Sequence, residues 1–252
     1  MKRVILFIIL FCLIVQVLDA QLWKMKRYEI TGGIGSSMFF GDVGGFSKTE
    51  NILGLRDLTF LQTRFNINLN FKYRITRDVN ARLSLTSGLL HASDNRGSND
   101  TRGYDAAISI FEPAVLGEYY LIKNSAENSY LFSKGKKGVI LGILKSLDIY
   151  AFTGIGGLLY NAKANDLLIA RQKLDGIEPG SFTAVIPVGI GSTLAFSSNI
   201  SFGVEFGARY TFTDNLDGFT SPTSSSNDVY DFFNFTITYK LKTTPNGFPS
   251  FR

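Results

Sequence analysis

Residues 65–73 alternate between apolar and polar side chains without exception. The segment reads Phe-Asn-Ile-Asn-Leu-Asn-Phe-Lys-Tyr, so every odd position is apolar or aromatic and every even position is polar or charged. Because successive side chains of a β-strand point to opposite faces, a strand here has one apolar face and one polar face. Several such strands behind a secretion signal favour a transmembrane barrel whose outer surface is the apolar face.

Residues 1–20 have the features of a signal peptide. A basic start, Met-Lys-Arg, precedes the mostly apolar run 4–18, and Ala20 supplies a small residue at the expected cleavage site. The run is shorter than the roughly 20 residues that a membrane-spanning helix needs. The single cysteine, Cys12, lies inside it, so we expect the mature chain, 21–252, to contain no disulfide.

Eight segments fit transmembrane strands of about ten residues, the length a tilted strand needs to cross a bilayer. They cover residues 28–40, 64–73, 79–89, 108–121, 147–160, 184–196, 200–212 and 232–241. The alternation is weakest in the fifth segment, where Gly154 and Gly156 favour the interior, and Pro113 predicts a bulge or a distorted ladder in the fourth. Outside the signal no apolar stretch reaches helix length, and only a closed barrel can then satisfy its backbone hydrogen bonds in lipid. We therefore predict an all-β fold, one eight-stranded antiparallel outer-membrane β-barrel over 21–252 with a filled polar interior.

The connections between these segments alternate in length. They are short after the second and sixth segments and long after the first, third, fifth and seventh. Bacterial barrels have short periplasmic turns and long external loops, which predicts periplasmic termini. Two aromatic girdles agree with this orientation. One consists of Tyr28, Tyr73, Tyr119 and Tyr239, and the other of Phe40, Phe65, Tyr210, Phe212 and Phe233.

The connection over residues 123–146 departs from this pattern, because it is long and lies on the predicted periplasmic side. It combines the apolar run 139–144 with a set of basic residues, Lys134, Lys136, Lys137 and Lys145. One interpretation is a solvated insertion. The other is a basic docking element that faces a periplasmic partner.

Charged residues share the predicted inner face. An eight-stranded barrel has room inside only for side chains, and buried charges need partners. The set is Glu29, Arg64, Arg82, Glu112, Glu118, Glu205 and Arg209, joined by Lys72 and Lys240. We expect the three arginines to form one network with Glu112, Glu118 and Glu205, which would block passage of bulk solute. An acid–base pair of Glu112 with Glu118 is the weaker alternative.

The sequence offers one enzymatic candidate, a histidine and a serine two residues apart. His91 and Ser93 resemble the arrangement in outer-membrane lipid A deacylases of the PagL type, which also need an acid to orient the histidine. Glu112 should point inward, and Asp94 and Asp105 fall in a predicted loop. A single histidine disfavours a multi-histidine metal site, and the paired glycines lie within strands rather than in phosphate-binding turns. We therefore predict no catalytic residue, cofactor, metal or small-molecule substrate. A net charge of +5 gives no reason to expect nucleic acid.

Several motifs, taken in order, resemble the PorG family of outer-membrane barrels from the type IX secretion and gliding apparatus of Bacteroidetes. The pieces are Met-Phe-Phe-Gly-Asp-Val at 38–43, Ile-Phe-Glu at 110–112, Asn-Ala-Lys-Ala at 161–164, Ile-Pro-Val-Gly-Ile-Gly at 186–191, and Gly-Val-Glu-Phe-Gly-Ala-Arg-Tyr-Thr-Phe-Thr-Asp-Asn-Leu-Asp at 203–217. The resemblance implies a non-enzymatic barrel in outer-membrane lipid that associates with a periplasmic ring of PorK- and PorN-like proteins. The long connection 123–146 departs from the compact family pattern.

Two functions stay open from the sequence. The first is a component of a type IX secretion or gliding apparatus that couples a periplasmic ring to the outer membrane of a Gram-negative cell. The alternative is a stand-alone barrel resembling OmpW or OmpX, acting in adhesion, stress resistance or passage of small hydrophobic solutes. Fold alone does not separate them.

Overall fold

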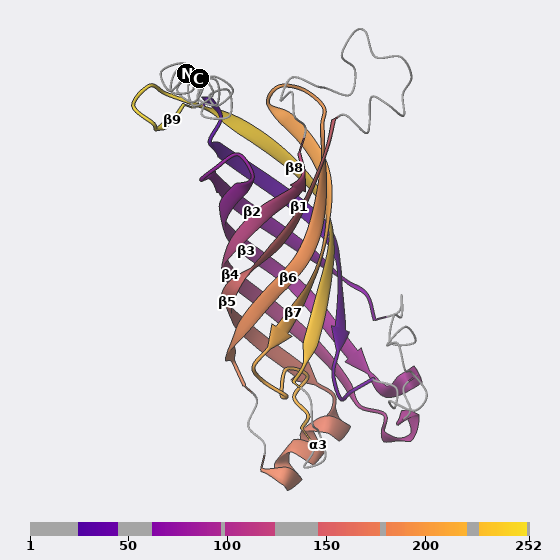
Figure 1. Cartoon of the computed structure of the whole chain (residues 1–252). Coiled ribbons are helices and arrows are strands. Elements are labelled where there is room, and N and C mark those ends of the chain that lie inside the picture. Colours follow the sequence, from indigo (N-terminus) through magenta and orange to yellow (C-terminus); the bar gives the residue numbers. More distant parts are fainter. Residues whose placement is uncertain are drawn as a thin grey trace, which may run out of the picture.

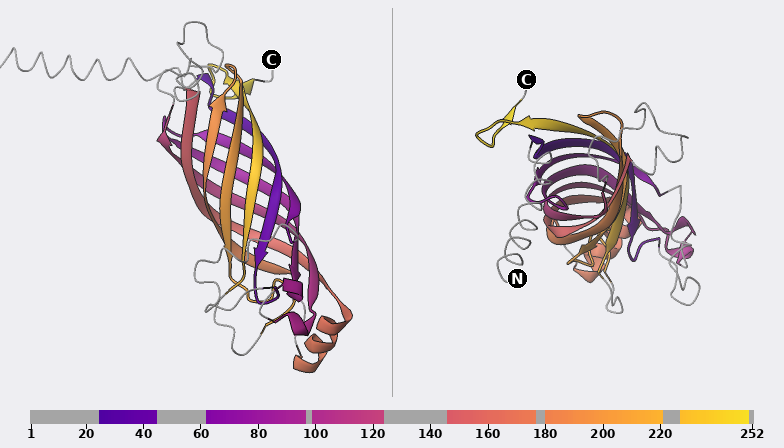
Figure 2. Two further views of the ribbon diagram at one scale, coloured as in Figure 1. Left: turned by 90° about the vertical axis from the view of Figure 1, so that its right-hand side faces the viewer. Right: turned by 45° about the horizontal axis from the view of Figure 1, so that its top comes forward.

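The computed structural model describes residues 25–44, 62–96, 99–123, 146–176, 180–220 and 227–250. In this part of the chain eight antiparallel strands pair in sequence order, and β1 also pairs with β8, which closes the barrel (Figures 1 and 2). The strands are β1 (Tyr28–Phe40), β2 (Arg64–Arg74), β3 (Val79–Ser93), β4 (Asp105–Ile122), β5 (Leu147–Ala164), β6 (Phe182–Ala195), β7 (Ile200–Thr211) and β8 (Val229–Thr243). A short β9 (Pro249–Ser250) pairs with the end of β8. The predicted fold class is confirmed.

Short helices gather at the barrel end farthest from the two chain termini (Figure 1). They are η3 (Asp94–Arg96), η4 (Asp100–Arg102) and α3 (Asp166–Asp175). We call this the loop end, and the opposite end, where β1 begins and β8 finishes, the terminal end. The side chain of Asn165 caps α3 by accepting a hydrogen bond from the Leu168 amide. None of the helices in the described ranges is long and apolar enough to cross a membrane.

The outer face of the barrel carries large exposed apolar side chains on every strand. Leu69 on β2 is 55% exposed, for example, whereas its neighbours Asn68 and Asn70 are buried. On β3 the outward apolar residues extend from Val79 to Leu89, about 33 Å along the strand at ~3.3 Å per residue. A tilt of about 40° turns this into an apolar band about 25 Å tall, the height typical of transmembrane barrels.

Toward the loop end the polarity of the wall inverts. There β3, β4 and β5 continue beyond the predicted segments, to Ser93, from Asp105 and to Ala164. The inward side chains of these extensions and of the adjoining strand residues are apolar and buried, namely Leu90, Ala92, Ala106, Ile108, Ile110, Leu158 and Tyr160. The outward side chains are mostly polar, namely His91, Asp105, Ser109, Asn161 and Lys163. A sheet that faces water has this arrangement, with apolar side chains on its inner face and polar side chains on its outer face. The extensions therefore lie outside the apolar band.

Two interruptions in the hydrogen-bonded ladder lie side by side near the middle of β5. Glu112 and Pro113 have no paired residue on β5, and Gly154 and Ile155 have none on β6, although the register is the same on both sides of each gap. Pro113 has no backbone N–H to donate, which explains the distorted ladder predicted there. The bulge in β4 is elsewhere, near Tyr120, where the register shifts by one residue.

Candidate functional site

Buried ion pairs fill the interior on the terminal side of the barrel. The guanidinium of Arg82 binds Glu205 through both Nη atoms, at 2.9 Å each, and Nη1 also lies 3.1 Å from Glu118 Oε1. The ammonium of Lys72 lies 2.8 Å from Glu118, and the Tyr150 hydroxyl donates to Glu205. We call these five residues the terminal-side cluster. Its two cations balance its two carboxylates, as a dry interior requires.

A second group, the loop-side cluster, consists of Glu112, Arg209 and Tyr230. The Tyr230 hydroxyl donates to Glu112 Oε2 at 2.5 Å, and Arg209 Nε lies 3.5 Å from Glu112 Oε1. The Arg209 guanidinium also lies over the Phe232 ring, 4.3 Å from its centroid. At the terminal mouth Arg74 Nη2 pairs with Glu29 at 3.3 Å.

The structure thus separates charges that the sequence analysis expected in one network. Glu112 and Glu118 are six residues apart on β4, about 20 Å at ~3.3 Å per residue, so each meets a different arginine. Arg64 begins β2 at the loop end, where its Nη1 donates to the Thr63 carbonyl. Tyr150 and Tyr230 are the members that sequence reasoning missed. Both have even residue numbers, and in β5 and β8 the even-numbered positions alternate with the outward ones. This alternation in the sequence could have placed them inside the barrel.

These clusters are structural in chemical character. Each carboxylate has a cationic or hydroxyl partner, and aromatic rings cover the cations. Arg82 lies 5.0 Å from the Phe152 centroid, and Lys72 lies 4.9 Å from that of Tyr150. Side chains therefore occupy the space between the strands rather than lining an open channel. Within the described ranges no group of three or more His, Cys, Asp or Glu residues is arranged to hold a metal ion.

His91 has an acidic partner that the sequence analysis dismissed. Asp105 begins β4 rather than lying in a loop, and its Oδ2 is 3.2 Å from His91 Nε2 on the outer face. Ser93 lies directly opposite Asp105 in the ladder. Ser93 Oγ and His91 Nδ1 are buried and have no hydrogen-bond partner within the described part of the chain, so they do not bond to each other. Ser93 is also only 4% exposed, which leaves the serine without an activating base or an open approach.

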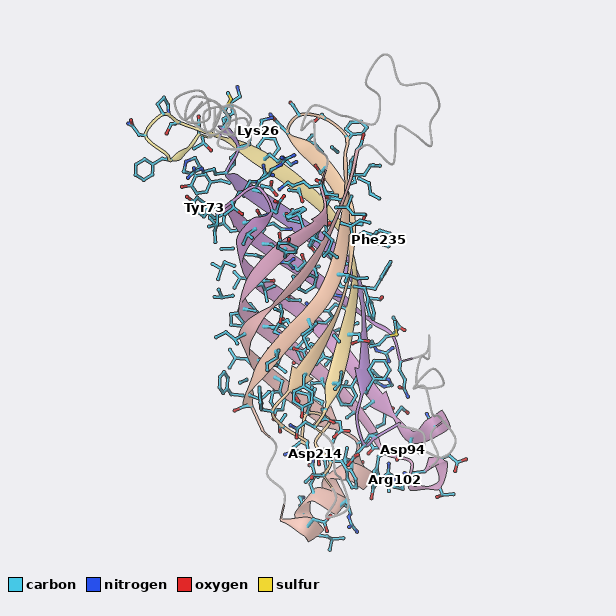
Figure 3. All side chains as sticks on the ribbon, in the orientation of Figure 1. Lys26, Tyr73, Asp94, Arg102, Asp214 and Phe235 are labelled. Atoms are coloured by element: carbon cyan, nitrogen blue, oxygen red, sulfur yellow. The ribbon has the colours of Figure 1, made fainter. Side chains whose placement is uncertain are left out.

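The described parts of the connections at the loop end pack together as the loop-end cap, which we define as residues 41–44, 94–96, 99–104, 165–176, 213–220 and 227–228. The Asp94 carboxylate accepts hydrogen bonds from the Gly44 amide at 2.9 Å, from the Tyr104 amide at 3.2 Å and from the Arg102 guanidinium. Arg102 also donates to the Asp42 carbonyl at 2.8 Å. Figure 3 shows Asp94, Arg102 and Asp214 together at this end.

Two buried carboxyl groups hold the last connection of the cap in place. Asp217 accepts the amides of Val43 and Phe219 at 3.0 and 2.9 Å, and Asp228 accepts the Leu216 amide at 2.7 Å. Burial raises the pKa of Asp217 to about 7, and burial together with the neighbouring Asp217 carboxylate raises the pKa of Asp228 to about 9.

The terminal end carries basic side chains among its described residues. The half-buried or exposed ones are Lys26, Arg27, Arg77, Lys123 and Lys242, and Asp78 lies beside them. Lys26 and Tyr73 mark this end in Figure 3. The proposed docking residues Lys134, Lys136, Lys137 and Lys145 lie outside the described residues.

Comparisons with known proteins return small barrels at low sequence identity. Neisserial surface protein A has 8% identity and a TM-score of 0.45, with 85% of this chain and 97% of that chain covered. The N-terminal β-barrel domain of Pseudomonas aeruginosa OprF has 8% identity and a TM-score of 0.42, covering 86% and 98%. Outer membrane protein W of E. coli has 14% identity and a TM-score of 0.40, covering 86% and 98%. No curated protein matches the chain. A family model matches residues 2–247, and the chain therefore belongs to the family described as "Domain of unknown function (DUF6089)".

Proposed function

We propose that this protein is a non-enzymatic outer-membrane barrel that anchors a periplasmic assembly through its terminal end. The observation that carries the proposal is the packed interior. Paired charges and aromatic rings fill the terminal side, and an apolar cluster with the loop-end cap fills the other side. A barrel filled in this way acts through its surfaces, and the apolar band commits the middle of the outer face to lipid.

Charge favours the terminal end as the docking surface. The exposed side chains Arg77 and Lys242 lie there with Lys26, Arg27 and Lys123. Among the described residues the loop end is mixed in charge instead, with the aspartates Asp42, Asp100, Asp166, Asp175 and Asp214 beside the basic residues Arg102, Lys163, Arg171 and Lys173. A basic surface steers an acidic partner, and the attraction weakens with salt because the Debye length is only about 8 Å at physiological ionic strength.

For the identity of the partner we extend the proposal to the type IX secretion and gliding apparatus. The support is the ordered set of motifs that resembles PorG-like barrels, which implies a periplasmic ring of PorK- and PorN-like proteins. In this assembly the terminal end faces the periplasm and the long connections face outward. The basic connection 123–146 begins and ends on that side, because it joins the terminal ends of β4 and β5.

The test is co-purification of ring proteins with charge-reversed variants in mild detergent. Arg77→Glu with Lys242→Glu reverses two exposed charges at the terminal end. Lys163→Glu with Lys173→Glu is the matched control, because both of these lysines are exposed at the loop end. We expect the first pair to lose the ring and the second pair to retain it, with both variants folded and inserted. Full capture by the first pair would place the docking surface elsewhere.

The stand-alone barrel is the second candidate, and the loop-end cap favours it. The cap is a packed surface at the opposite end, held by buried polar contacts such as those of Asp94 and Asp217. If wild-type protein captures no ring component and its deletion leaves secretion unchanged, this second function replaces the first.

A further inference from the structure

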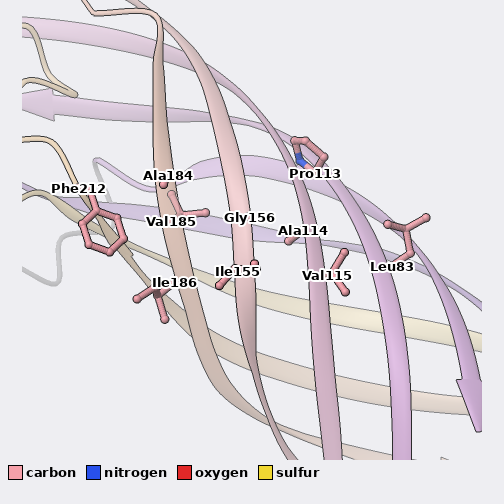
Figure 4. A pocket seen from close by; sticks show the side chains of 10 residues that line it. All are labelled: Leu83, Pro113, Ala114, Val115, Ile155, Gly156, Ala184, Val185, Ile186 and Phe212. Atoms are coloured by element: carbon pink, nitrogen blue, oxygen red, sulfur yellow. The ribbon is translucent and has the colours of Figure 1, made fainter. Parts of the chain in front are cut away.

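A groove crosses the outer wall of the barrel over β3 to β7 (Figure 4). Its lining is almost entirely apolar, and its cavity volume is ≈ 520 Å³, within the range of ligand pockets of roughly 300–1,000 Å³. The rim is made by outward residues such as Leu83, Val115, Ile155 and Phe212. Ile155 is 72% exposed, so the groove opens to the surroundings of the barrel and not to its interior.

The groove lies where the ladder is interrupted. Pro113 on β4 and Ile155 on β5 lack paired residues on the next strand, and both line it. Small residues, Ala114, Gly156 and Ala184, are part of its lining. Gly156 leaves no room for a larger residue, since a Cβ would lie 2.9 Å from the Ala114 Cβ and 3.1 Å from a Val185 methyl group.

The long axis of the groove fits a hydrocarbon chain. From Leu83 on β3 to Phe212 just after β7 it spans four strand spacings, about 19 Å at 4.7–4.9 Å each. One leaflet of a bilayer has a hydrocarbon thickness of about 15 Å, half of ~30 Å. Leu83 is near the middle of the outward apolar stretch of β3, residues 79–89, whereas Phe212 follows the loop end of β7. The groove therefore rises obliquely from the middle of the apolar band toward its loop-end edge.

We propose that this groove is a binding site for one acyl chain of a membrane lipid, from the leaflet on the loop-end side. Three observations carry it. The groove is continuous with the lipid-facing band, its lining offers almost nothing to a polar group, and its length and inclination match a chain rather than a side chain of a neighbouring protein. The inference rests on the membrane insertion proposed above.

The probe is a phosphatidylcholine that carries a photoreactive diazirine in its acyl chain, mixed into phosphatidylcholine vesicles that contain the refolded protein. After illumination, mass spectrometry of peptides locates the adducts. We expect enrichment on Leu83, Val115 and Ile155 relative to exposed outward residues away from the groove, such as Ile34 on β1 and Ile237 on β8.

A filling variant sharpens the experiment. Ala184 points outward, is exposed and lines the groove, so Ala184→Phe should abolish the enrichment without touching the barrel interior. Ala151→Phe is the matched control, since Ala151 also points outward on β5 but lies nearer the terminal end, and it should retain the enrichment.

Each contrary outcome has a separate meaning. Labelling in simple proportion to exposure, with no preference for the groove, overturns the site while insertion stands. Cross-linked copies of the chain joined at the groove would mean that a second barrel covers it, which also overturns the site. Absence of label on every outward residue overturns the membrane insertion itself.

Discussion

Replacing Arg82 by methionine should be among the most destabilising single changes in the barrel. The variant keeps much of the side-chain volume but removes a buried guanidinium that makes three hydrogen bonds to Glu118 and Glu205 and one to Asn70. At roughly 1.5–3 kcal/mol for each hydrogen bond to a charged group, the three alone give an upper range of about 4.5–9 kcal/mol. Breaking one partner of a buried pair typically costs about 3–5 kcal/mol.

For Arg82→Met we expect a loss of stability at the lower end of the range of about 3–5 kcal/mol. Lys72 stays in place, 2.8 Å from Glu118 and 3.8 Å from Glu205, and can compensate part of the lost charge. We therefore expect a loss of about 3 kcal/mol in the free energy of unfolding. The assay is reversible urea unfolding in phospholipid vesicles, followed by circular dichroism and by the mobility of unheated protein on gels.

Two further variants make the result decisive. Arg77→Met removes an exposed arginine and should change the stability by less than about 0.5 kcal/mol. Combining Arg82→Met with Glu205→Gln should cost less than the sum of the single changes, by about 1–3 kcal/mol, because the second change removes the orphaned charge. The reasoning is refuted if Arg82→Met behaves like Arg77→Met, or if the two effects are additive.

Three other perturbations test separate parts of the structure. Leu69→Arg should cost about 2–4 kcal/mol because Leu69 faces lipid, and a cysteine label at Leu69 but not at inward Asn68 should report lipid contact; the reverse pattern contradicts the register. Raising the pH should loosen the loop-end cap. Asp217 and Asp228 have a higher pKa in the folded protein than in the unfolded chain, where it is about 3.9, so each contributes its full stabilisation only below that pH. The contribution is lost as the pH rises from there to about 7 for Asp217 and to about 9 for Asp228. Amide exchange protection in the cap at each pH measures the loss, and Asp228→Asn should flatten it. Gly154→Ala should block barrel formation on gels, since its Cβ would lie 2.1 Å from a backbone oxygen of β4; a normally folded variant contradicts the close approach of the strands.

Strand positions were predictable where the two faces differ in polarity. The expected starts at Tyr28, Val79, Leu147 and Ile200 coincide with the observed ones, because alternation begins sharply at the terminal end of the barrel, and the expected start of β2 at Arg64, at the loop end, coincides as well. The same test made β3, β4 and β5 too short at their loop ends. Beyond Leu89 the inner residues become apolar and the outer ones polar, so the contrast that defines a lipid-facing strand reverses.

Contacts at the candidate sites were predictable only in part. Parity places Arg82, Glu118 and Glu205 on the inner face, and this much follows from period two alone. Which charges meet depends on the height of each residue in the barrel, and that height depends on strand tilt and on the stagger between strands. The pairing of His91 with Asp105 was missed for a related reason, since the extension of β4 turned a predicted loop residue into a strand residue.

What the sequence determined by itself was therefore the closed barrel, its strand order and the apolar outer band. Regular alternation leaves one face that only lipid solvates well, and no other architecture satisfies the backbone there. The tertiary structure decided the division of the interior into two charge clusters, the loop-end cap and the groove beside Pro113. Each of these depends on how strands that are distant in sequence are placed and staggered against one another. Side-chain periodicity within a strand contains no information about that placement.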